Sequence, residues 1–512
     1  MDFSGKVSMK KIGFDNEKYL KEQTSCILER VKQFDNKLYL EFGGKIVFDY
    51  HASRVLPGFD PNVKIKLLQQ LKDNADLILC IYAGDIERRK IRADFGITYD
   101  VDALKLIDDL RDWGVTVTAV VITRFENQPS ARIFKNKLER RGMKVYTHKF
   151  TKGYPTDVDM IVSDEGYGAN EYIETTKPLV VVTGPGPGSG KLATCLSQLY
   201  HDSKKGESSG YAKFETFPIW NMPLKHPVNV AYEAATADLK DFNMIDSFYL
   251  DVYGEKAVNY NRDMEIFPVI NRILQKICGK EIAYKSPTDM GVNRAGFGVI
   301  DDGAVQEASE QEIIRRYFRC SCEHAIGFGD KDSIQRVELL MKDLGINPED
   351  RTVVKFSREA AAKAEKSGKG NEGTFCGAAI ELNDGKIITG RNSEIMHAAS
   401  SVIINAIKHL AGIEDKVHLL SPEIMQSIGS LKEKILNKHS VSLDLEETLI
   451  ALSICAAIDP KTKLAVEKLQ ELKKCEVHLT HMPASGDEDG FRSLGVNLTS
   501  DPKFSSRRLY LS

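Results

Sequence analysis

The residues best suited to chemistry lie in Lys177–Thr194, which reads KPLVVVTGPGPGSGKLAT. A short apolar run leads into alternating glycines and prolines (the glycine loop, Gly184–Gly190), and Lys191 then opens a segment with a helical pattern. A buried strand, a loop of exposed backbone amides and a helix N-terminus form a construction that binds phosphate. We predict that this loop binds phosphate through Gly186, Gly188, Ser189, Gly190, Lys191 and Leu192.

The glycine loop departs from the phosphate-loop pattern G-x-x-x-x-G-K-[ST] at two positions. Pro185 stands where the first glycine is expected, and Leu192 replaces the Ser or Thr whose hydroxyl binds magnesium. Pro185 and Pro187 donate no amide hydrogen, so an anion would rely on the amides from Gly188 to Leu192. The core GPGSGK still resembles the phosphate loop of nucleoside-monophosphate kinases. The dinucleotide pattern G-x-G-x-x-G fails, which disfavours redox chemistry.

A phosphate loop works with a carboxylate at a strand end, which holds magnesium or polarises water. Asp164 and Glu165 follow an apolar run that we predict as the strand Val158–Ser163. Asp251 lies in a second predicted strand, Ser247–Tyr253. The candidate catalytic residues are Lys191, Asp164, Glu165 and Asp289.

The segment Tyr284–Gly298, YKSPTDMGVNRAGFG, is the second candidate for a site. It is rich in glycine and in side chains that carry charge or form hydrogen bonds, as ligand-binding loops often are. Surface crossings share this composition, so a purely structural role stays open. Elsewhere, Arg124 could act as an anion clamp. The candidate substrate-binding residues are Arg124, Lys285, Ser286, Thr288, Asn293 and Arg294.

Two patterns point toward metal chemistry, and neither is complete. In Cys320–His324, CSCEH, one residue between the cysteines is too short for a zinc pair, and HLTH (His478–His481) could join only through a long-range contact. The segment Cys376–Gly390 followed by His397-Ala398-Ala399 is similar to the hairpin and helix that open cytidine deaminases. The last alanine replaces the essential Glu, and no P-C-x-x-C follows. We predict no metal site.

The glycine loop must be positioned by the elements around it, and these alternate regularly. Apolar runs predict strands at Ala75–Tyr82, Val115–Thr123 and Lys144–His148, with helices between them. Buried strands that alternate with helices indicate an α/β fold with a mostly parallel, doubly wound sheet, whose ligands lie beyond the carboxyl ends of the strands. Nearer the start, Leu38–Phe42 and Ile46–Tyr50 would form a hairpin around the two glycines between them.

The character of the sequence changes near Gly327–Asp330, and we place a domain boundary there. Residues 1–328 would form a P-loop-like α/β domain with helical additions, and residues 329–512 a separate α+β domain. In the second domain, Asn383-Asp384-Gly385 predicts a hairpin turn. Thr352–Phe356 is predicted as a strand and Ser485–Gly490 as an acidic loop.

The bulk composition excludes several classes of protein. With 512 residues, 42% hydrophobic residues and a net charge of −3, the chain suits two or three domains and not a general nucleic-acid binder. No apolar run approaches the roughly 20 residues that span a bilayer. Nine scattered cysteines indicate a reduced, cytoplasmic protein. We expect a small phosphorylated molecule as partner, no nucleic acid and no membrane, and a homo-oligomer stays open.

Three motifs together resemble one family of uncharacterised bacterial cytosolic proteins, known only as a domain of unknown function. They are Thr183–Tyr200 (TGPGPGSGKLATCLSQLY), Tyr284–Gly298 and His397–Ile413 (HAASSVIINAIKHLAGI). The resemblance covers nearly the whole chain from Met9 onward. It implies a P-loop-like α/β N-terminal part, a distinct C-terminal part and no established activity.

Three functions remain open. The leading hypothesis is an enzyme that binds a nucleotide or another phosphorylated metabolite at the glycine loop and transfers phosphate or drives an ATP-dependent ligation. ATP or another nucleotide would be its cofactor, whereas Leu192 argues against magnesium. The second is a non-catalytic sensor of a phosphorylated metabolite or a scaffold. The third is a nucleotide-sugar-type transferase that uses the sheet without a true P-loop.

Overall fold

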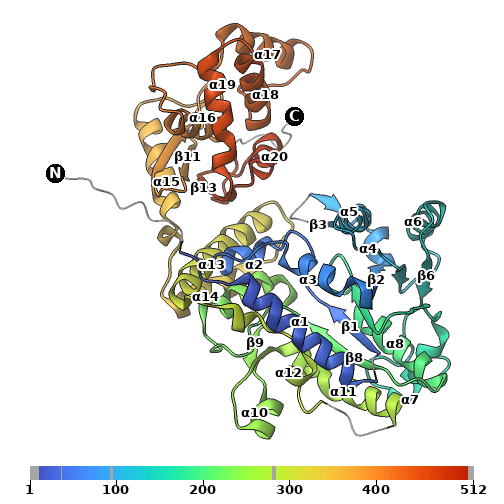
Figure 1. Cartoon of the computed structure of the whole chain (residues 1–512). Coiled ribbons are helices and arrows are strands. Elements are labelled where there is room, and N and C mark those ends of the chain that lie inside the picture. Colours follow the sequence, from blue (N-terminus) through green and yellow to red (C-terminus); the bar gives the residue numbers. More distant parts are fainter. Residues whose placement is uncertain (1–10, 36, 93–95, 280–283, 506–512) are drawn as a thin grey trace. The chain divides into compact units, whose positions relative to one another are not determined.

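The computed structural model describes residues 11–35, 37–92, 96–279 and 284–505 (Figure 1). The chain divides into two compact units. The N-terminal unit contains Ile12–Glu233 and Asp241–Ser309, and the C-terminal unit contains Ala234–Lys240 and the described residues from Glu310 onward. None of the described helices combines the length and the apolar character that a membrane span requires.

The described residues of the N-terminal unit form a six-stranded sheet in which all neighbouring strands are parallel. Across the sheet the order is β6, β5, β2, β7, β1, β8. The strands are β1 (Leu38–Phe42), β2 (Ala75–Tyr82), β5 (Ala119–Thr123), β6 (Val145–His148), β7 (Leu179–Thr183) and β8 (Gly210–Phe214). This sheet confirms the predicted α/β class.

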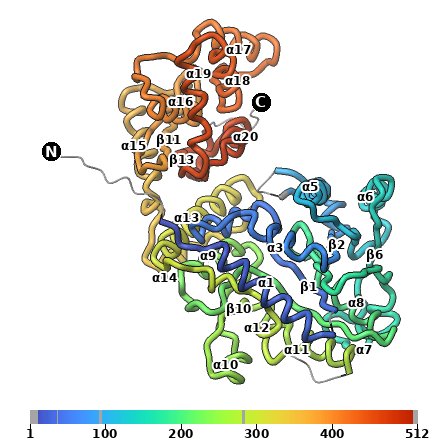
Figure 2. Tube along the Cα trace, viewed as in Figure 1, coloured from blue at the N-terminus to red at the C-terminus, as the bar shows by residue number. Residues whose placement is uncertain are grey.

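Helices cover both faces of this sheet, as its apolar strands require. Successive strand residues point to opposite faces, so Leu40 packs among α1, α3, α5 and α6 while Tyr39 packs among α8 and α11. Figure 2 shows α8 beside β1 on the second face. These helices are α1 (Asn16–Gln33), α3 (Val63–Leu71), α5 (Tyr99–Asp112), α6 (Pro129–Arg140), α8 (Lys191–Lys204) and α11 (Asn261–Cys278).

The strand order reverses between β2 and β7. From β2 the chain runs outward through β5 to β6, and β7 then returns to the other side of β2. Such a reversal opens a crevice at the carboxyl ends of the two central strands, where ligands of α/β sheets bind. The glycine loop follows β7 directly and therefore lies at this reversal.

Three predictions of strands in this unit are wrong. The segment Leu38–Phe42 forms no hairpin, because it pairs in parallel with β7 and β8, and α2 (Tyr50–Val55) begins where the second strand was expected to end. The expected strand Val158–Ser163 is instead the helix α7 (Val158–Ile161), in which the Asp157 side chain accepts a hydrogen bond from the Met160 amide. A capping aspartate satisfies a free helix amide and so favours a helical turn over a strand.

The predicted strand Ser247–Tyr253 is likewise a helix, α10 (Ser247–Tyr253). The side chain of Asp246 caps its start by accepting a hydrogen bond from the Tyr249 amide, and Gly254 ends it in the left-handed conformation. The remaining helices and strands of this unit are α4 (Ala83–Glu87), α12 (Pro287–Met290), β3 (Ile91–Arg92), β4 (Ile97–Thr98), β9 (Asn243–Ile245) and β10 (Val258–Tyr260). Helices α9 (Pro227–Ala235) and α13 (Asp302–Ala325) begin in this unit and end in the C-terminal unit, which also contains α14 (Lys331–Leu344).

The described residues of the C-terminal unit form a four-stranded mixed sheet in the order β12, β11, β13, β14. The predicted hairpin is present as the antiparallel pair β11–β12, and β13 runs parallel to β14. The elements are α15 (Thr352–Lys366), β11 (Gly377–Glu381), β12 (Ile387–Arg391), α16 (Ala398–Leu410), α17 (Pro422–Lys434), α18 (Leu445–Ala456), α19 (Pro460–Glu467), β13 (Glu476–Leu479), α20 (Ser485–Leu494) and β14 (Asn497–Ser500).

Two predictions for the C-terminal unit are wrong. The expected strand Thr352–Phe356 is the first part of α15, and the expected acidic loop Ser485–Gly490 is the first part of α20. In α20 the acidic residues lie in the first turn, where the helix dipole favours negative charge. Helix α15 packs so closely on β11 that a Cβ atom on Gly377 would lie 2.1 Å from the Ser357 carbonyl oxygen.

Candidate functional site

The glycine loop joins the end of β7 to the start of α8 at the reversal of strand order. Gly188 and Gly190 have φ angles of 73° and 92°, in the left-handed region that favours glycine. Gly190 is the N-cap of α8, and a Cβ atom there would lie 2.7 Å from Cγ2 of Thr123. The loop therefore lies directly against the carboxyl end of β5, and only glycine fits at position 190.

Side chains from the ends of other strands hold the loop in place. The Thr123 hydroxyl donates a hydrogen bond of 2.8 Å to the Ser189 carbonyl oxygen. The Arg124 guanidinium donates to the Gly188 carbonyl oxygen and lies 3.5 Å from the centre of the Tyr82 ring. One donor of Arg124, a predicted substrate-binding residue, is therefore already hydrogen-bonded to the loop. Because the loop is fixed from outside, its own donors remain oriented toward the crevice.

Several donors of the loop are unpaired. Within the described part of the chain, the backbone amides of Gly186, Gly188, Ser189 and Gly190 have no hydrogen-bond acceptor. The Ser189 side chain is 2% exposed, and its hydroxyl also lacks a partner among these residues. Lys191 Nζ lies 3.5 Å from the Gly186 carbonyl oxygen, so the ammonium group bends back over the loop. These groups together can surround an anion.

The sequence did not single out Glu41, a carboxylate on β1, the strand next to β7. Glu41 lies opposite Val182 of β7, and its side chain points to the face that α8 covers. Burial raises the pKa of the Cys195 thiol, Glu41 raises it further, and Lys191 opposes both. Glu41 and Lys191 thus act on the same buried thiol. Glu41 is thus an acidic side chain near the carboxyl end of the strand beside β7.

A cluster of charged and phenolic side chains extends from Glu41 across β8. The Tyr211 hydroxyl donates a 2.7 Å hydrogen bond to Glu41, and Lys213 lies opposite Glu41 in the strand register. Lys213 Nζ lies 2.7 Å from both carboxylate oxygens of Asp263 and also contacts the Tyr260 hydroxyl. We name this group the Lys213 cluster: Glu41, Tyr211, Lys213, Glu215, Tyr260 and Asp263.

The electrostatics of the Lys213 cluster are those of a buried cation among several acids. Burial alone would lower the pKa of Lys213, but Asp263, Glu215 and Glu41 raise it, so the lysine is charged. Glu215 Oε1 lies 3.3 Å from Lys213 Nζ. Burial raises the pKa of Glu215, and the charges of Asp263 and Glu41 raise it further against the opposing effect of Lys213. Glu215 is thus prepared to hold or exchange a proton.

Gly43 leaves the space that Glu215 occupies. A Cβ atom on Gly43 would lie 2.6 Å from Cγ of Glu215, so the carboxylate lies directly over this turn. The side chain of Glu215 is 28% exposed, which leaves it accessible from the crevice. The two glycines predicted to form a hairpin turn instead let a catalytic type of side chain approach the carboxyl end of β1.

The predicted acids Asp164 and Glu165 lie away from the glycine loop. Asp164 accepts a 2.6 Å hydrogen bond from the Tyr200 hydroxyl and pairs with Lys204 at 3.4 Å. Tyr200 lies nine residues beyond Lys191 in α8, a rise of about 14 Å. Glu165 pairs with Lys152 on the surface. Neither acid is brought together with Lys191.

The segment Tyr284–Gly298 holds the N-terminal unit together locally. The Ser286 hydroxyl caps α12 by accepting from the Asp289 amide, and the Thr288 hydroxyl donates to Asp246 at 2.7 Å. Asp289 accepts hydrogen bonds from the Lys285 amide and from Tyr253. These contacts give the side chains of Ser286, Thr288 and Asp289 structural partners.

The second half of this segment anchors neighbouring elements. The Asn293 side chain donates to the carbonyl oxygens of Thr216 and Pro218, and the Arg294 amide donates to Gln23. The segment also bonds to the outer edge of β8, where the Val292 amide donates to the Lys213 carbonyl oxygen. It therefore lies three strand spacings from β7, about 14 Å, on the far side of the Lys213 cluster.

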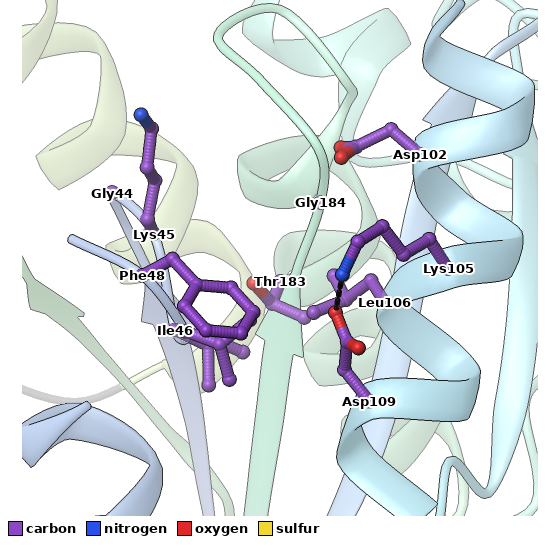
Figure 3. A pocket seen from close by; sticks show the side chains of 11 residues that line it. Gly44, Lys45, Ile46, Phe48, Asp102, Lys105, Leu106, Asp109, Thr183 and Gly184 are labelled. Atoms are coloured by element: carbon purple, nitrogen blue, oxygen red, sulfur yellow. Dashed lines mark hydrogen bonds and ion pairs between the residues drawn. The ribbon is translucent and has the colours of Figure 1, made fainter. Parts of the chain in front are cut away.

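A small hollow lies on the opposite face of β7 from the Lys213 cluster. Figure 3 shows Phe48 and Ile46 on one side, Leu106 and Asp109 of α5 on the other, and Thr183 between them. The Thr183 hydroxyl is buried and has no partner among the described residues. The hollow measures about 20 Å³, which is room for roughly one water molecule. It is too small for a substrate.

The chain matches two family models and a set of bacterial relatives. The models are described as domain of unknown function DUF1846, N-terminal, over residues 12–345, and DUF1846, C-terminal, over residues 349–510. A UPF0371 protein of Clostridium tetani is 60% identical over 500 residues, which covers 98% of this chain and 99% of that protein. A UPF0371 protein of Clostridium botulinum (strain Langeland) matches with the same identity and coverage. The chain belongs to the DUF1846 family. The predicted resemblance to an uncharacterised bacterial family is therefore confirmed.

The DUF1846 chain also carries a charged pair where the deaminase-like pattern was noticed. His397 is the N-cap of α16, and its Nδ1 lies 2.8 Å from Asp487 in the first turn of α20. Burial alone would lower the pKa of His397, but the hydrogen bond and charge of Asp487 raise it, with Asp444 adding to the effect. Asp487 also accepts from the Leu445 amide. The pair connects the N-terminal ends of α16, α18 and α20, so its contacts are those of a structural interaction.

Sequence reasoning on this DUF1846 protein missed the Lys213 cluster because β8 was not predicted. One signal could have revealed it. In GYAKFE the residues Tyr211, Lys213 and Glu215 alternate with small or apolar residues, which places three polar side chains on one face of a short strand. A polar face on a buried strand is unusual and marks a functional candidate.

Proposed function

We propose that this DUF1846 protein binds a small phosphorylated metabolite, with ATP and other nucleotides among the candidates, and that its phosphate lies at the glycine loop. The unpaired loop donors carry this proposal: four backbone amides and the Ser189 hydroxyl lack partners among the described residues. Gly188 is exposed and Gly186 and Gly190 are partly exposed, so their amides are accessible to an anion, which successive backbone N–H groups of a loop can bind. Lys191 adds a positive charge at the start of α8.

The Lys213 cluster supports a second role for the same site, phosphate transfer or ATP-dependent ligation. Across the sheet, Glu41 lies one strand away from β7 and Glu215 two strands away, which corresponds to about 5 and 10 Å between backbones. A carboxylate can accept the proton of an attacking hydroxyl or amine when the bound substrate brings that group within hydrogen-bond reach of it. Glu215 suits this task because its pKa is raised toward neutrality by burial.

One observation favours a non-catalytic sensor instead. Leu192 stands where a phosphate loop supplies the hydroxyl for magnesium, and its side chain packs against the core between α8, α11 and the sheet. A packed leucine offers no metal ligand, and loss of magnesium weakens phosphate transfer more than phosphate binding. Under this alternative the loop would report the concentration of a metabolite without converting it.

Binding is tested by isothermal titration of ATP, GTP and inorganic phosphate, each with and without magnesium. Lys191→Ala should weaken binding about 10- to 150-fold, since a hydrogen bond to a charged group contributes about 1.5–3 kcal/mol. Lys204→Ala is the matched control, because it removes a lysine from the other end of the same helix, where the side chain is 59% exposed. If none of these ligands binds, or if both variants behave alike, the proposal fails.

Turnover separates the enzyme from the sensor. A panel of phosphorylated metabolites with candidate acceptors would be incubated with the wild type and with Glu215→Gln, and products followed by mass spectrometry. Product that forms with the wild type and not with Glu215→Gln supports phosphate transfer. Binding without product across the panel supports the sensor.

A further inference from the structure

The C-terminal unit contains a cleft that the glycine loop does not explain. Its volume of 520 Å³ lies within the range of about 300–1,000 Å³ that small-molecule sites occupy. It opens at the edge of the sheet where the parallel strands β13 and β14 end and β11 begins. The residues of this cleft that matter here are Arg358, Phe375, Thr480, His481, Lys503 and Phe504.

The walls of the cleft are fixed by backbone contacts. On one side, α15 packs directly on β11 at Gly377. On the other side, the Asp501 amide donates a 2.9 Å hydrogen bond to Leu479, and the Met482 amide donates a 2.8 Å hydrogen bond to Lys503. The chain that follows β14 is thus tied to the chain that follows β13. The cleft is a formed feature of the fold.

The cleft contains a cation that the described residues leave without a counter-ion. Arg358 is held by Asp501, with Nη2 at 2.7 Å from Oδ1 and Nε at 3.2 Å from Oδ2, so its charge is offset. Lys503 has no ion-pair partner in the described part of the chain, although the exposed Glu365 also lines the rim. Burial and the charge of Lys503 lower the pKa of His481, so this ring is neutral near pH 7. Lys503 lies exposed at the cleft, so an anion bound there would meet a positive charge that the described residues leave unpaired.

Two aromatic rings line the same cleft. Phe504 is 56% exposed, and Phe375 is half-buried. A phenylalanine this exposed loses the burial that normally stabilises its side chain. A planar ring bound against Phe504 and Phe375 would restore that burial, and base-on-aromatic stacking is a common way to hold nucleotides.

We propose that this cleft binds a nucleoside monophosphate, with the base against Phe504 and Phe375 and the phosphate at Lys503. The Thr480 hydroxyl, which accepts from the Gly377 amide and contacts His481, presents a further polar group at the floor. This site is separate from the glycine loop, so the protein would carry two binding sites for phosphorylated molecules on its two units.

The test uses AMP as the probe and the full chain with Lys191→Ala, so that binding at the glycine loop is weakened. Titration calorimetry should show that the protein binds AMP more tightly than adenosine, which lacks the phosphate, and more tightly than ribose 5-phosphate, which lacks the base. Phe504→Ala and Lys503→Gln should each weaken AMP binding about tenfold or more. The matched controls are Phe328→Ala, which removes a phenylalanine that is 86% exposed, and Lys416→Gln, which removes an exposed lysine.

A covalent readout locates the ligand independently of affinity. Photolysis with 8-azido-AMP should label peptides that contain Phe375 or Phe504, and excess AMP should prevent the labelling. The proposal is overturned if AMP does not bind at millimolar concentration, if the label lies elsewhere, or if the cleft variants bind AMP as well as the controls. Because Lys191 is absent throughout, failure here says nothing against phosphate binding at the glycine loop, and the reverse also holds.

Discussion

Replacing Lys213 by methionine should destabilise the N-terminal unit, because it leaves several acids without their counter-ion. Lys213 Nζ lies 2.7 Å from both oxygens of Asp263, and both side chains are 11% exposed. Methionine keeps most of the apolar stem, so the change removes the charge with little loss of packing. Breaking a buried ion pair from one side costs about 3–5 kcal/mol. We expect about 3 kcal/mol, since Glu215 remains partly exposed to water.

Urea unfolding followed by tryptophan fluorescence measures this loss of unfolding free energy in the N-terminal unit. Both tryptophans, Trp113 and Trp220, belong to the N-terminal unit. Lys204→Met is the control, because it removes a lysine whose pairing with Asp164 is exposed to water and therefore contributes little to stability. A double variant that also carries Asp263→Leu should recover part of the loss, since the uncompensated charge is then gone.

The pH dependence of Lys213→Met gives a second, independent check. Without the lysine, the pKa of Glu215 in the folded state lies further above its unfolded value, because the charge of Lys213 no longer opposes the effect of burial. Such an acid binds protons more readily when folded, so the stability of the variant relative to the wild type increases as pH falls from 7 toward 5. The reasoning is refuted if the loss at pH 7 is below about 1 kcal/mol, or if it is equally large at pH 5.

Three further predictions concern single side chains. Gly190→Ala should lower the melting temperature and abolish phosphate binding, because alanine at φ 92° costs about 1–3 kcal/mol and its Cβ would meet Thr123 at 2.7 Å. The control is Gly206→Ala, which is also at positive φ but has open space around it, and which should lower stability without affecting binding. Arg358→Ala should remove about 1 kcal/mol at pH 7, since the hydrogen bonds from Arg358, together with the nearby His478, lower the pKa of Asp501 to about 2 against the effect of burial. This stability is present above the unfolded pKa near 3.9 and is lost as pH falls toward 2, so acid unfolding of the variant should begin at higher pH. His397→Gln should lower stability more at pH 6 than at pH 9 in thermal melts, because the raised pKa of His397 gives a contribution that is complete below about 6.5 and is lost as pH rises through the folded value; equal losses at both pH values would contradict it.

The strand-loop-helix of the glycine loop could be predicted because all of its signals are local. The apolar run before Gly184, the glycines and Lys191 lie within one short segment, and each specifies its own conformation. The alternation of apolar strands with helices likewise indicated a parallel sheet. Both results depend only on neighbours in sequence.

The partners of the loop could not be predicted, because they depend on the order of strands across the sheet. Glu41 lies in a strand that is more than a hundred residues from β7 in sequence and beside it in space. The two glycines after β1 favoured a hairpin, which is the shortest connection available to a local argument. The parallel pairing of β1 with β7 and β8 buries β1 on both faces, and this tertiary gain overrides the turn signal.

The predicted acids failed for a related reason. The runs before Asp164 and around Asp251 are apolar enough for strands, but Asp157 and Asp246 each cap a helix there. An aspartate before a short apolar run satisfies helix amides whether or not the run could pair in a sheet. Reading these caps from the sequence would have removed both candidate strands, and with them the reason for placing an acid beside the loop.

The Lys213 cluster bears on whether the glycine loop only binds its ligand. Enclosing a lysine with several acids is a poor way to stabilise a fold, since apolar residues of similar size are often as good or better. A sensor needs the loop, Lys191 and little else, whereas proton transfer to a bound ligand needs an acid or base with a displaced pKa within hydrogen-bond reach of the reacting group. Glu41 lies on β1 and Glu215 directly after β8, both on the α8 side of the sheet, and burial raises the pKa of Glu215. The proposal of phosphate transfer gives these acids a role that the sensor does not, and Glu215→Gln, which keeps the shape of the side chain, is the substitution that distinguishes the two.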